Sequence, residues 1–223
     1  DENSQEENIE TPADKEEIVT EEEINEEIEY TVENNFSTCP IVDNINNPNY
    51  SYQTSWKFVD ENNSQFTQDI LKFAGIGIVD GYDDGTFKPM QEMTRTEFLK
   101  VALISHCYEY RELEWMTEYN DVEKNTWQAR VIEKAQSLGM INGDRDEQGN
   151  KIFRPNDVIS KAEAVKILMR ISMIQAQETN PTAYSDITVD WHTKYIENGE
   201  ALWLFDTDKD NYKFRPDSWV KRE

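Results

Sequence analysis

The chain is poor in the residues that most often build catalytic and metal centres. Of its 223 residues, two are histidine and two are cysteine. Neither His106 nor His192 lies at a spacing typical of a nucleophile with its base or of a zinc site. Cys39 and Cys107 are too few for a disulfide framework, although one bridge between them is left open. Carboxylates are too numerous for a catalytic pair to be singled out. We therefore predict that the chain is not an enzyme and has no cofactor.

Basic residues and long apolar runs are also scarce. The 22 Lys and Arg residues face 46 Asp and Glu residues, which gives a formal net charge of −24. Binding to nucleic acid or to an anionic membrane surface depends on Lys and Arg, so we exclude both partners. No apolar run approaches the roughly 18 residues that span a bilayer, which excludes membrane insertion. The chain begins at Asp1 without Met, as expected of a processed secreted protein or an excised fragment.

The negative charge is concentrated at the N-terminus. Residues 1–35 hold 15 acidic residues and one basic residue, Lys15, so they carry −14 and leave −10 for the rest. The segment is mostly Glu and Asn, with too little apolar surface to offset the entropy of ordering it. We predict a disordered acidic tail that serves as a solvated spacer, with cation capture as the alternative. Residues 36–57 are predicted to be a linker.

The remainder of the chain contains an internal repeat. A Phe, a basic residue and a Pro recur at Phe87-Lys88-Pro89, Phe153-Arg154-Pro155 and Phe214-Arg215-Pro216. Another basic residue follows each Pro at the same distance, at Arg95, Lys161 and Arg222. Matching offsets at three places predict tandem repeats, which we assign to residues 58–117, 118–182 and 183–223.

Each repeat is predicted to begin with a helix. An aromatic residue stands two positions before an Asp in each repeat, and we interpret these pairs as helix starts: Phe58 and Asp60, Tyr119 and Asp121, Tyr184 and Asp186. Apolar residues at helical spacing follow Phe66, Trp127 and Trp191. The predicted helix ends, where a left-handed cap is favoured, fall near Gly75, Gly77, Gly139 and Gly199. There is little strand pattern.

A second helix follows the Phe-x-Pro loop in the first two repeats. Thr94 with Glu97, and Ser160 with Glu163, have the spacing of a capping box. Each repeat is therefore predicted to be helix, loop, helix. Since a two-helix unit cannot bury its apolar face alone, we predict a mainly α fold in which three repeats pack as a pseudo-threefold bundle.

These residues resemble the S-layer homology domain family, whose hallmark is a Phe-x-Pro loop followed by a Thr-Arg-Ala-Glu motif. The first repeat matches through Gly81, Phe87, Pro89 and Thr94-Arg95-Thr96-Glu97, and the second through Gly143, Phe153, Pro155 and Ser160-Lys161-Ala162-Glu163. The third repeat, with Phe214 and Pro216, departs from the pattern. It has Asp206 at the position of the loop glycine, and the chain ends at Glu223, before the motif's own Glu.

The resemblance implies a module of the bacterial cell envelope or S-layer. Such modules anchor a surface protein non-covalently by binding secondary cell-wall polysaccharide, often pyruvylated, in grooves between repeats. In other lineages the partner is a peptidoglycan-linked polymer. The motif's basic position falls on Arg95, Lys161 and Arg222. Lys161 is a departure, because an ammonium group cannot make the planar two-point contact that a guanidinium makes with a carboxylate.

The residues themselves also favour an anionic ligand. A basic residue in the first helical turn is unfavourable for the helix dipole, so its recurrence at three equivalent positions needs an explanation other than helix stability. A bound anion at the helix N-terminus would explain it. The alternative explanation is a salt bridge from Arg95 to a nearby acid. Trp127 and Trp191 could stack on sugar rings or lie in the core. The predicted binding set also includes Gly81 and Gly143.

Two further alternatives stay open. Asp206, Asp208 and Asp210 have the spacing of a calcium loop, and residues 144–149 form a reduced version of it; solvated loop acids are the other interpretation. The grooves could also hold acidic peptides or neighbouring subunits. The chain would then be a protein interaction scaffold within a surface lattice, stabilised by calcium.

Overall fold

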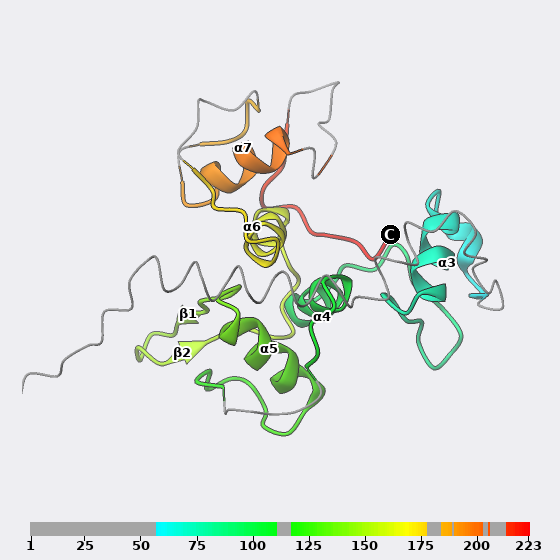
Figure 1. Ribbon diagram of the computed structural model, residues 1–223, viewed down its shortest axis with the longest axis horizontal. Helices are drawn as coiled ribbons and strands as arrows, with labels where there is room; N and C mark the ends of the chain where they lie inside the picture. The colour runs from blue at the N-terminus through cyan, green and yellow to red at the C-terminus, as the bar shows by residue number, and fades with distance from the viewer. Residues whose placement is uncertain (1–56, 111–116, 178–183, 189, 203–204, 206–212) are drawn as a thin grey trace, which may run out of the picture.

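The computed structural model describes residues 57–110, 117–177, 184–188, 190–202, 205 and 213–223 (Figure 1). The predicted tail, residues 36–56 of the predicted linker, and the acids Asp206, Asp208 and Asp210 lie outside the described residues. The described elements are η1 (Glu61–Asn63), α3 (Thr67–Gly75), α4 (Arg95–Ser105), α5 (Trp127–Ser137), β1 (Asp144–Arg145), β2 (Lys151–Ile152), α6 (Lys161–Ile171) and α7 (Thr193–Ala201). The mainly α prediction is confirmed.

The first two repeats each have two helices, α3 with α4 and α5 with α6, as predicted. Helix α4 packs against α5 and α6, and α6 packs against α7. The second helix of one repeat therefore packs against the first helix of the next. In Figure 1, α3, α5 and α7 lie around the outside of α4 and α6. None of the helices in the described part of the chain is long and apolar enough to cross a membrane.

The main core lies where α4, α5 and α6 meet. Its fully buried side chains include Leu99 and Leu103 of α4 and Val131 and Ile132 of α5. Smaller clusters pack beneath α3, around Phe58 and Phe87, and beneath α7. Burial of the main core joins the first two repeats, because α4 packs against both α5 and α6. The cluster beneath α3 uses residues of the first repeat alone.

Both predicted capping boxes are present. The Thr94 hydroxyl accepts a hydrogen bond from the Glu97 backbone N–H at 3.2 Å, and the Glu97 carboxylate accepts one from the Thr94 N–H at 2.8 Å. Ser160 and Glu163 make the same pair of bonds at 3.3 and 3.0 Å. These bonds satisfy backbone donors that the first turn of a helix leaves open.

All four glycines lie near helix ends, as predicted, but only two are left-handed caps. Gly77 and Gly139 follow the last turns of α3 and α5 with φ of 81° and 65°. Gly75 is the last residue of α3, and Gly199 lies in the last turn of α7, without a left-handed conformation. Gly199 is required by packing, since a Cβ atom there would lie 2.7 Å from the Phe205 ring.

The aromatic and Asp pairs are not helix starts, which corrects the sequence interpretation. Phe58, Tyr119 and Tyr184 are buried, and the first α-helices begin several residues later; in the first repeat only the single 3-10 turn η1 follows Asp60 directly. The carboxylate after each aromatic residue instead accepts two adjacent backbone N–H groups of the Phe-x-Pro loop. Asp121 accepts from Phe153 at 2.8 Å and Arg154 at 2.6 Å. Asp60 and Asp186 bind the other two loops in the same way, at 2.8 to 2.9 Å.

This carboxylate clamp stabilises an unusual backbone conformation. The basic residues of the three loops, Lys88, Arg154 and Arg215, have φ of 58°, 61° and 58°. Such left-handed geometry costs a residue with a side chain about 1–2 kcal/mol. Two charge-assisted hydrogen bonds per loop offset that cost.

The loops that precede the second helices are joined in a closed ring of hydrogen bonds. Met93 N–H donates to the Val220 carbonyl at 2.9 Å, Val220 N–H to Ile159 at 3.1 Å, and Ile159 N–H back to Met93 at 3.0 Å. Each residue comes from a different repeat, so the C-terminal segment lies beside the first repeat (Figure 1). Pseudo-threefold packing of the whole repeats stays a prediction, because the third repeat is described only in part.

The second repeat also contains an unpredicted hairpin. Strands β1 and β2 are antiparallel, with Asp144 opposite Ile152 and Arg145 opposite Lys151. At the turn, the Asp146 carboxylate accepts hydrogen bonds from the Gln148 and Asn150 backbone N–H groups. Strands of two residues carry no periodic apolar signal, so hydropathy could not predict them.

Candidate functional site

The motif's basic residues reach from one repeat to the Phe-x-Pro loop of another. Arg95 Nε donates to the Phe153 carbonyl at 3.0 Å, and its guanidinium carbon lies 4.7 Å from the centre of the Phe153 ring. Arg222 makes the equivalent contacts with Phe87, at 2.9 and 4.7 Å. Lys161 Nζ lies 6.0 Å from the centre of the Phe214 ring. The three predicted basic residues therefore occupy equivalent inter-repeat positions.

Two grooves lie beside these contacts. The first groove has a volume of about 160 Å³ and combines the loop before Phe87 with residues of α4, α5 and the C-terminal segment. Its lining includes Val79, Asp80, Gly81, Tyr82, Glu97, Lys100, Trp127 and Arg222. The groove therefore brings together Gly81, Trp127 and Arg222, which the sequence placed in the binding set.

The second groove has a volume of about 330 Å³ and repeats this arrangement one repeat further along. Its lining includes Ile141, Asn142, Gly143, Asp144, Arg95, Arg154, Glu163, Lys166 and Trp191. It brings together the predicted residues Arg95, Gly143 and Trp191. Lys161 lines neither groove, and the loop expected beside it, residues 206–212, lies outside the described residues.

The groove tryptophans are not core residues. Trp127 is 41 % exposed and Trp191 is 46 % exposed, so the core interpretation is wrong for both. Lys100 Nζ lies 6.0 Å from the centre of the Trp127 ring, and Lys166 Nζ lies 4.9 Å from the centre of the Trp191 ring. Each groove thus has an ammonium group near an accessible aromatic ring, where a cation can interact with its face.

Sequence reasoning missed both lysines. Lys100 stands three residues after Glu97, and Lys166 stands three residues after Glu163. Residues three apart in a helix share a face, so each lysine lies on the groove side of its helix next to the motif Glu. The equal offset in two repeats is the signal that could have identified them.

A family model for the S-layer homology domain matches residues 58–99 and 118–165. Each segment runs from the buried aromatic residue into the second helix and contains the carboxylate clamp and the capping box. Both segments are S-layer homology domains. The third predicted repeat, residues 183–223, stays a prediction.

Proteins similar to this chain in sequence are named as surface, anchoring or enzyme proteins. The chain is 28 % identical over 153 residues to "Exoglucanase XynX" of Acetivibrio thermocellus, covering 66 % of the chain and 13 % of that protein. It is 31 % identical over 147 residues to the "Cellulosome-anchoring protein" of the same species, covering 56 % and 30 %. It is 27 % identical over 103 residues to the "Surface layer protein" of Brevibacillus choshinensis, covering 45 % and 9 %. The matched stretch is thus a minor part of each relative.

The loop glycines of the two S-layer homology domains are required by packing. A Cβ atom on Gly81 would lie 2.4 Å from the Phe58 ring, and one on Gly143 would lie 2.2 Å from the Tyr119 ring. Gly143 also has φ of 63°, which disfavours any side chain. The glycines let the groove loop lie directly on the buried aromatic residue. Their place in a ligand contact stays a prediction.

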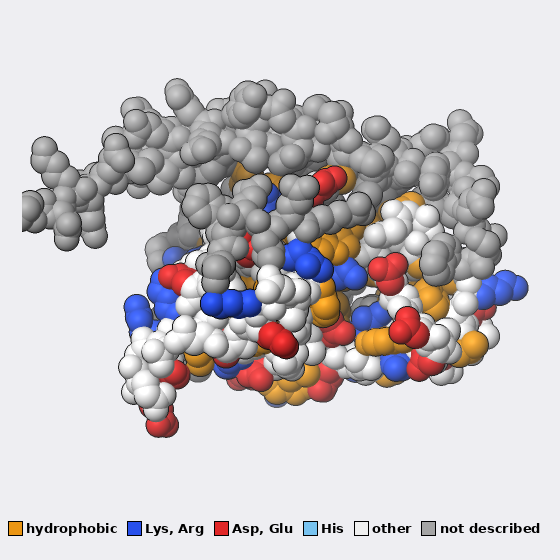
Figure 2. All heavy atoms as spheres, turned by 90° about the horizontal axis from the view of Figure 1, so that it is seen from below, with side chains coloured by type: hydrophobic (Ala, Val, Ile, Leu, Met, Phe, Trp, Pro, Cys, Tyr) orange, Lys and Arg blue, Asp and Glu red, His pale blue; other side chains and the backbone are white. Residues whose placement is uncertain are grey.

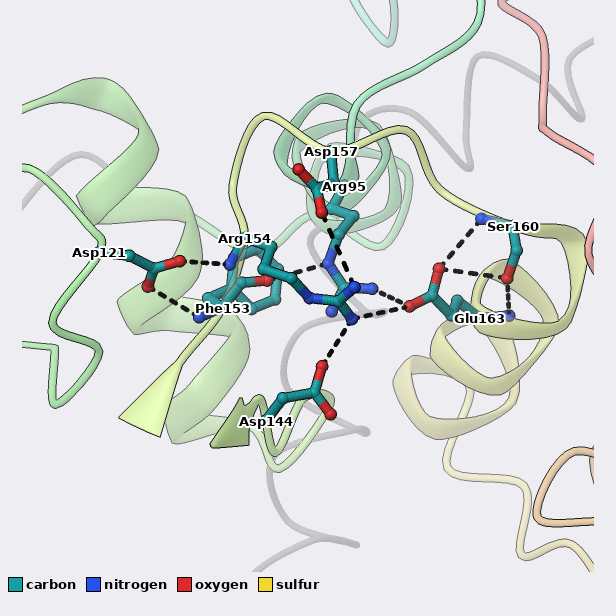
Figure 3. A network of polar contacts seen from close by, with 8 residues as sticks. All are labelled: Arg95, Asp121, Asp144, Phe153, Arg154, Asp157, Ser160 and Glu163. Carbon is teal, nitrogen blue, oxygen red and sulfur yellow. Dashed lines mark hydrogen bonds and ion pairs between the residues drawn. The ribbon is translucent and has the colours of Figure 1, made fainter. Parts of the chain in front are cut away.

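The second groove contains a network of ion pairs (Figure 3). Arg95, which is 7 % exposed, pairs through Nη1 with the Glu163 carboxylate. Arg154 pairs with Asp144 at 2.5 Å and lies 3.8 Å from Glu163 and 3.7 Å from Asp157. The salt bridge considered for Arg95 as an alternative to ligand binding is therefore present.

The first groove has different electrostatics. Arg222 Nη2 donates to the Asp80 backbone carbonyl at 2.9 Å, and the guanidinium carbon lies 4.8 Å from the centre of the Tyr82 ring. The Asp80 carboxylate pairs with Lys100 at 3.6 Å. Tyr82 corresponds to Asp144 of the second groove. Arg222 stacks on this ring and makes no ion pair within the described residues, whereas its counterpart Arg95 pairs with Glu163.

Charges of both signs are mixed across the surface. Figure 2 shows Lys and Arg side chains interspersed with Asp and Glu side chains on the visible face. Each basic side chain in a groove therefore lies near acidic side chains. Whether it is already paired with one of them decides whether it is available to bind an external anion.

The described residues provide no metal site. No group of three or more His, Cys, Asp or Glu side chains within them is arranged to hold an ion. In the reduced calcium loop, the Asp146 carboxylate binds its own turn and Asp144 pairs with Arg154. Calcium at Asp206, Asp208 and Asp210 stays a prediction. Cys107 is disulfide-bonded, and Cys39 lies outside the described residues.

Proposed function

We propose that this chain anchors the protein that carries it to the bacterial cell wall. It acts at the cell envelope as a binding module and not as an enzyme. Its partner is an anionic secondary cell-wall polysaccharide or another peptidoglycan-linked polymer, which binds non-covalently in the first and second grooves. The S-layer homology domains support this role, as do relatives named for the surface layer, the cell wall and anchoring.

One observation carries the proposal: each described groove combines a half-exposed tryptophan with basic side chains and a close-packed glycine loop. A sugar ring presents an apolar face that can stack on Trp127 or Trp191. Carboxylate or phosphate groups on the polymer accept charge-assisted hydrogen bonds from Arg or Lys. The carboxylate of a pyruvate ketal would fit this chemistry. A neutral polymer would leave the cations without an external partner.

The test is co-sedimentation of the chain with purified cell walls of Acetivibrio thermocellus. Walls are compared before and after chemical removal of their non-peptidoglycan polymer. The unaltered chain should pellet with intact walls and stay in solution with stripped walls. Replacing both Trp127 and Trp191 by Ala should abolish pelleting.

Trp219→Ala is the matched control, since Trp219 is 46 % exposed and lines neither groove. Its variant should pellet like the unaltered chain. Pelleting that survives removal of the polymer would contradict the proposal and favour a protein interaction scaffold. Equal losses for Trp219→Ala and the double variant would also contradict it.

A further inference from the structure

The second helices α4 and α6 bury their apolar faces unequally. At the offset of the repeat motif, Phe98 of α4 corresponds to Ala164 of α6, and Ala102 of α4 corresponds to Leu168 of α6. Ala164 and Ala102 are buried in the main core between the first two repeats. Phe98 and Leu168 are both partly exposed. Each of these two side chains therefore lies on a helix flank that, in the other second helix, is covered by a neighbour.

Helix α3 shows the same inequality. Phe73, Ala135 and Gly199 each stand three residues before the C-cap of their helices, α3, α5 and α7. Ala135 is fully buried, and a Cβ atom on Gly199 would lie 3.0 Å from the Val165 side chain of α6. This position therefore faces the second helix of the preceding repeat. Phe73 is 37 % exposed, so its partner at that position is not among the described helices.

By the equivalence of the repeats, Phe73, Phe98 and Leu168 face one place, which we call the open face. In the described part of the chain, α5 packs against α4 and α7 packs against α6, whereas α3 packs mainly against η1. Helices α4 and α6 follow two members of the hydrogen-bonded ring, Met93 and Ile159. Figure 1 shows the third segment of the ring ending between α3 and these two helices. A helix at that point would cover the open face.

The sequence of the predicted tail contains one segment with the features of such a helix. Thr20 and Glu23 have the capping-box spacing found at the start of α4 and α6. Val19, directly before the cap, is placed to pack on the residue after Glu23 as a hydrophobic staple. Apolar residues then recur every fourth position and share one side of a helix: Ile24, Ile28 and Val32. Most other positions are Glu, which suits a solvent-facing side and the first helical turn.

The position of the disulfide favours this segment as the occupant. Cys107 is disulfide-bonded and directly follows the C-cap of α4, and the chain's other cysteine is Cys39. A bridge between the two fixes residue 39 at the C-terminal end of α4. A helix over residues 21–33 would be about 20 Å long, and α4 is about 16 Å long. The segment can therefore lie along α4 in the same direction, beginning near the hydrogen-bonded ring as α4 and α6 do.

We propose that residues 20–33 form a helix that packs on the open face, where it takes the place of a second helix for the third repeat. Its apolar stripe covers Phe73, Phe98 and Leu168, and its glutamates face solvent. Removal of both apolar surfaces from water offsets the entropy of ordering the segment. This part of the tail therefore completes the fold, whereas residues 1–19 keep the predicted role of a spacer.

The experiment is amide hydrogen exchange of the full, oxidised chain, followed by mass spectrometry near neutral pH. Peptides that cover residues 22–32 should exchange about tenfold or more slowly than peptides from residues 3–15 of the same tail. Ile28→Asp should remove this protection, because a charge cannot be buried against the open face. Ile9→Asp is the matched control and should leave it unchanged. Peptides from α5 should exchange alike in both variants, which shows that the repeats stay folded.

A second pair of variants tests the surface on which the segment packs. Phe73→Ser should speed exchange of residues 22–32 by about fivefold or more, since the segment loses its contact with α3. Val59→Ser is the control, because Val59 belongs to the same repeat but is 80 % exposed and lies outside the open face. Peptides from α4 report whether either substitution unfolds the first repeat. Peptide mapping without reductant should find Cys39 linked to Cys107 within one chain.

Three outcomes would overturn the inference. Equally fast exchange along the whole tail would mean that residues 20–33 form no docked helix. Protection that survives Phe73→Ser would place the helix on another surface. A fast-exchanging tail in a chain that sediments as a dimer would assign the open face to a second copy. None of these outcomes bears on wall binding in the two grooves, so the proposed function is tested separately.

Discussion

Arg95 and Glu163 join the first S-layer homology domain to the second through an ion pair between the first turns of α4 and α6. One Glu163 oxygen pairs with Arg95 while the other accepts the Ser160 backbone N–H at 3.0 Å. A single carboxylate therefore caps its own helix and holds the neighbouring repeat. The basic and acidic positions of the motif thus serve repeat assembly, whatever part they play in binding.

Arg95→Gln should lower the free energy of unfolding by about 2–4 kcal/mol, because the partly buried Glu163 carboxylate loses its direct charge partner and keeps only Arg154 at 3.8 Å. The side chains are 9 % and 24 % exposed, so water replaces the lost contact poorly. Arg222→Gln should cost less than half as much, since Arg222 makes the same carbonyl hydrogen bond without an ion pair. Urea unfolding followed by circular dichroism measures both, and equal losses would contradict the structural role of the pair.

Asp121→Asn should destabilise the second Phe-x-Pro loop. Both Asp121 oxygens accept backbone N–H groups, and an amide keeps only one acceptor, so we expect a loss of about 2–3 kcal/mol. Asp157→Asn in the same loop is the control. Its carboxylate is 58 % exposed and contacts Arg154 at 3.7 Å, so its loss should stay below about 1 kcal/mol. Urea unfolding compares the two, and similar midpoints would mean that the clamp contributes little.

The features that sequence predicted correctly depend on neighbours within a few residues. The capping boxes of Thr94 and Ser160 and the left-handed Gly77 and Gly139 are set by local backbone requirements, which fixed spacings reveal. The contacts of Asp121 with Phe153 and of Arg95 with Glu163 span 32 and 68 residues. Nothing in the local pattern specifies such pairs, so the sequence wrongly predicts a helix start at the aromatic and Asp pair.

For the groove residues, too, the sequence predicts the local features but not the long-range contacts. The repeat offset identifies Arg95 and Arg222, but only the tertiary arrangement shows that Arg95 pairs with an acid of another repeat whereas Arg222 stacks on Tyr82. Trp127 and Trp191 fit a core pattern because they precede apolar helix positions, yet each lies at the rim of a groove. Spacing therefore located the site, whereas exposure and charge pairing required the fold.

Gly143→Ala should destabilise the second repeat far more than Gly149→Ala. Both glycines have positive φ, 63° and 85°, so both substitutions bear a backbone cost of about 1–2 kcal/mol. A Cβ atom at Gly149 meets open space, whereas at Gly143 it would lie 2.2 Å from the Tyr119 ring and 2.6 Å from the Ile152 carbonyl oxygen. Overpacking should add about 1–3 kcal/mol at Gly143 alone. Thermal unfolding of the two variants gives the comparison, and equal midpoints would show that the loop moves freely off the ring.

Tyr119→Phe should stabilise the chain and reduce its loss of stability in alkali. The Tyr119 hydroxyl is buried without a hydrogen-bond partner among the described residues, and the equivalent residue of the first repeat is Phe58. Removing an unsatisfied hydroxyl should raise the free energy of unfolding at pH 7 by about 1 kcal/mol. A smaller value, or a loss, would indicate that the hydroxyl makes a stabilising contact.

The alkaline effect follows from the pKa of Tyr119, which burial raises from 10.0 to about 12. Between these values the unfolded chain has released the phenolic proton while the folded chain keeps it, so stability falls as pH rises from 10 to 12. The variant has no such proton and should show a shallower fall. The pKa of Tyr184 is also raised to about 12, mainly by burial, so part of the decline should remain until Tyr184→Phe is added. Urea unfolding at pH 7, 9 and 11 measures the slopes, and parallel curves for the variant and the unaltered chain would show that Tyr119 does not cause the fall.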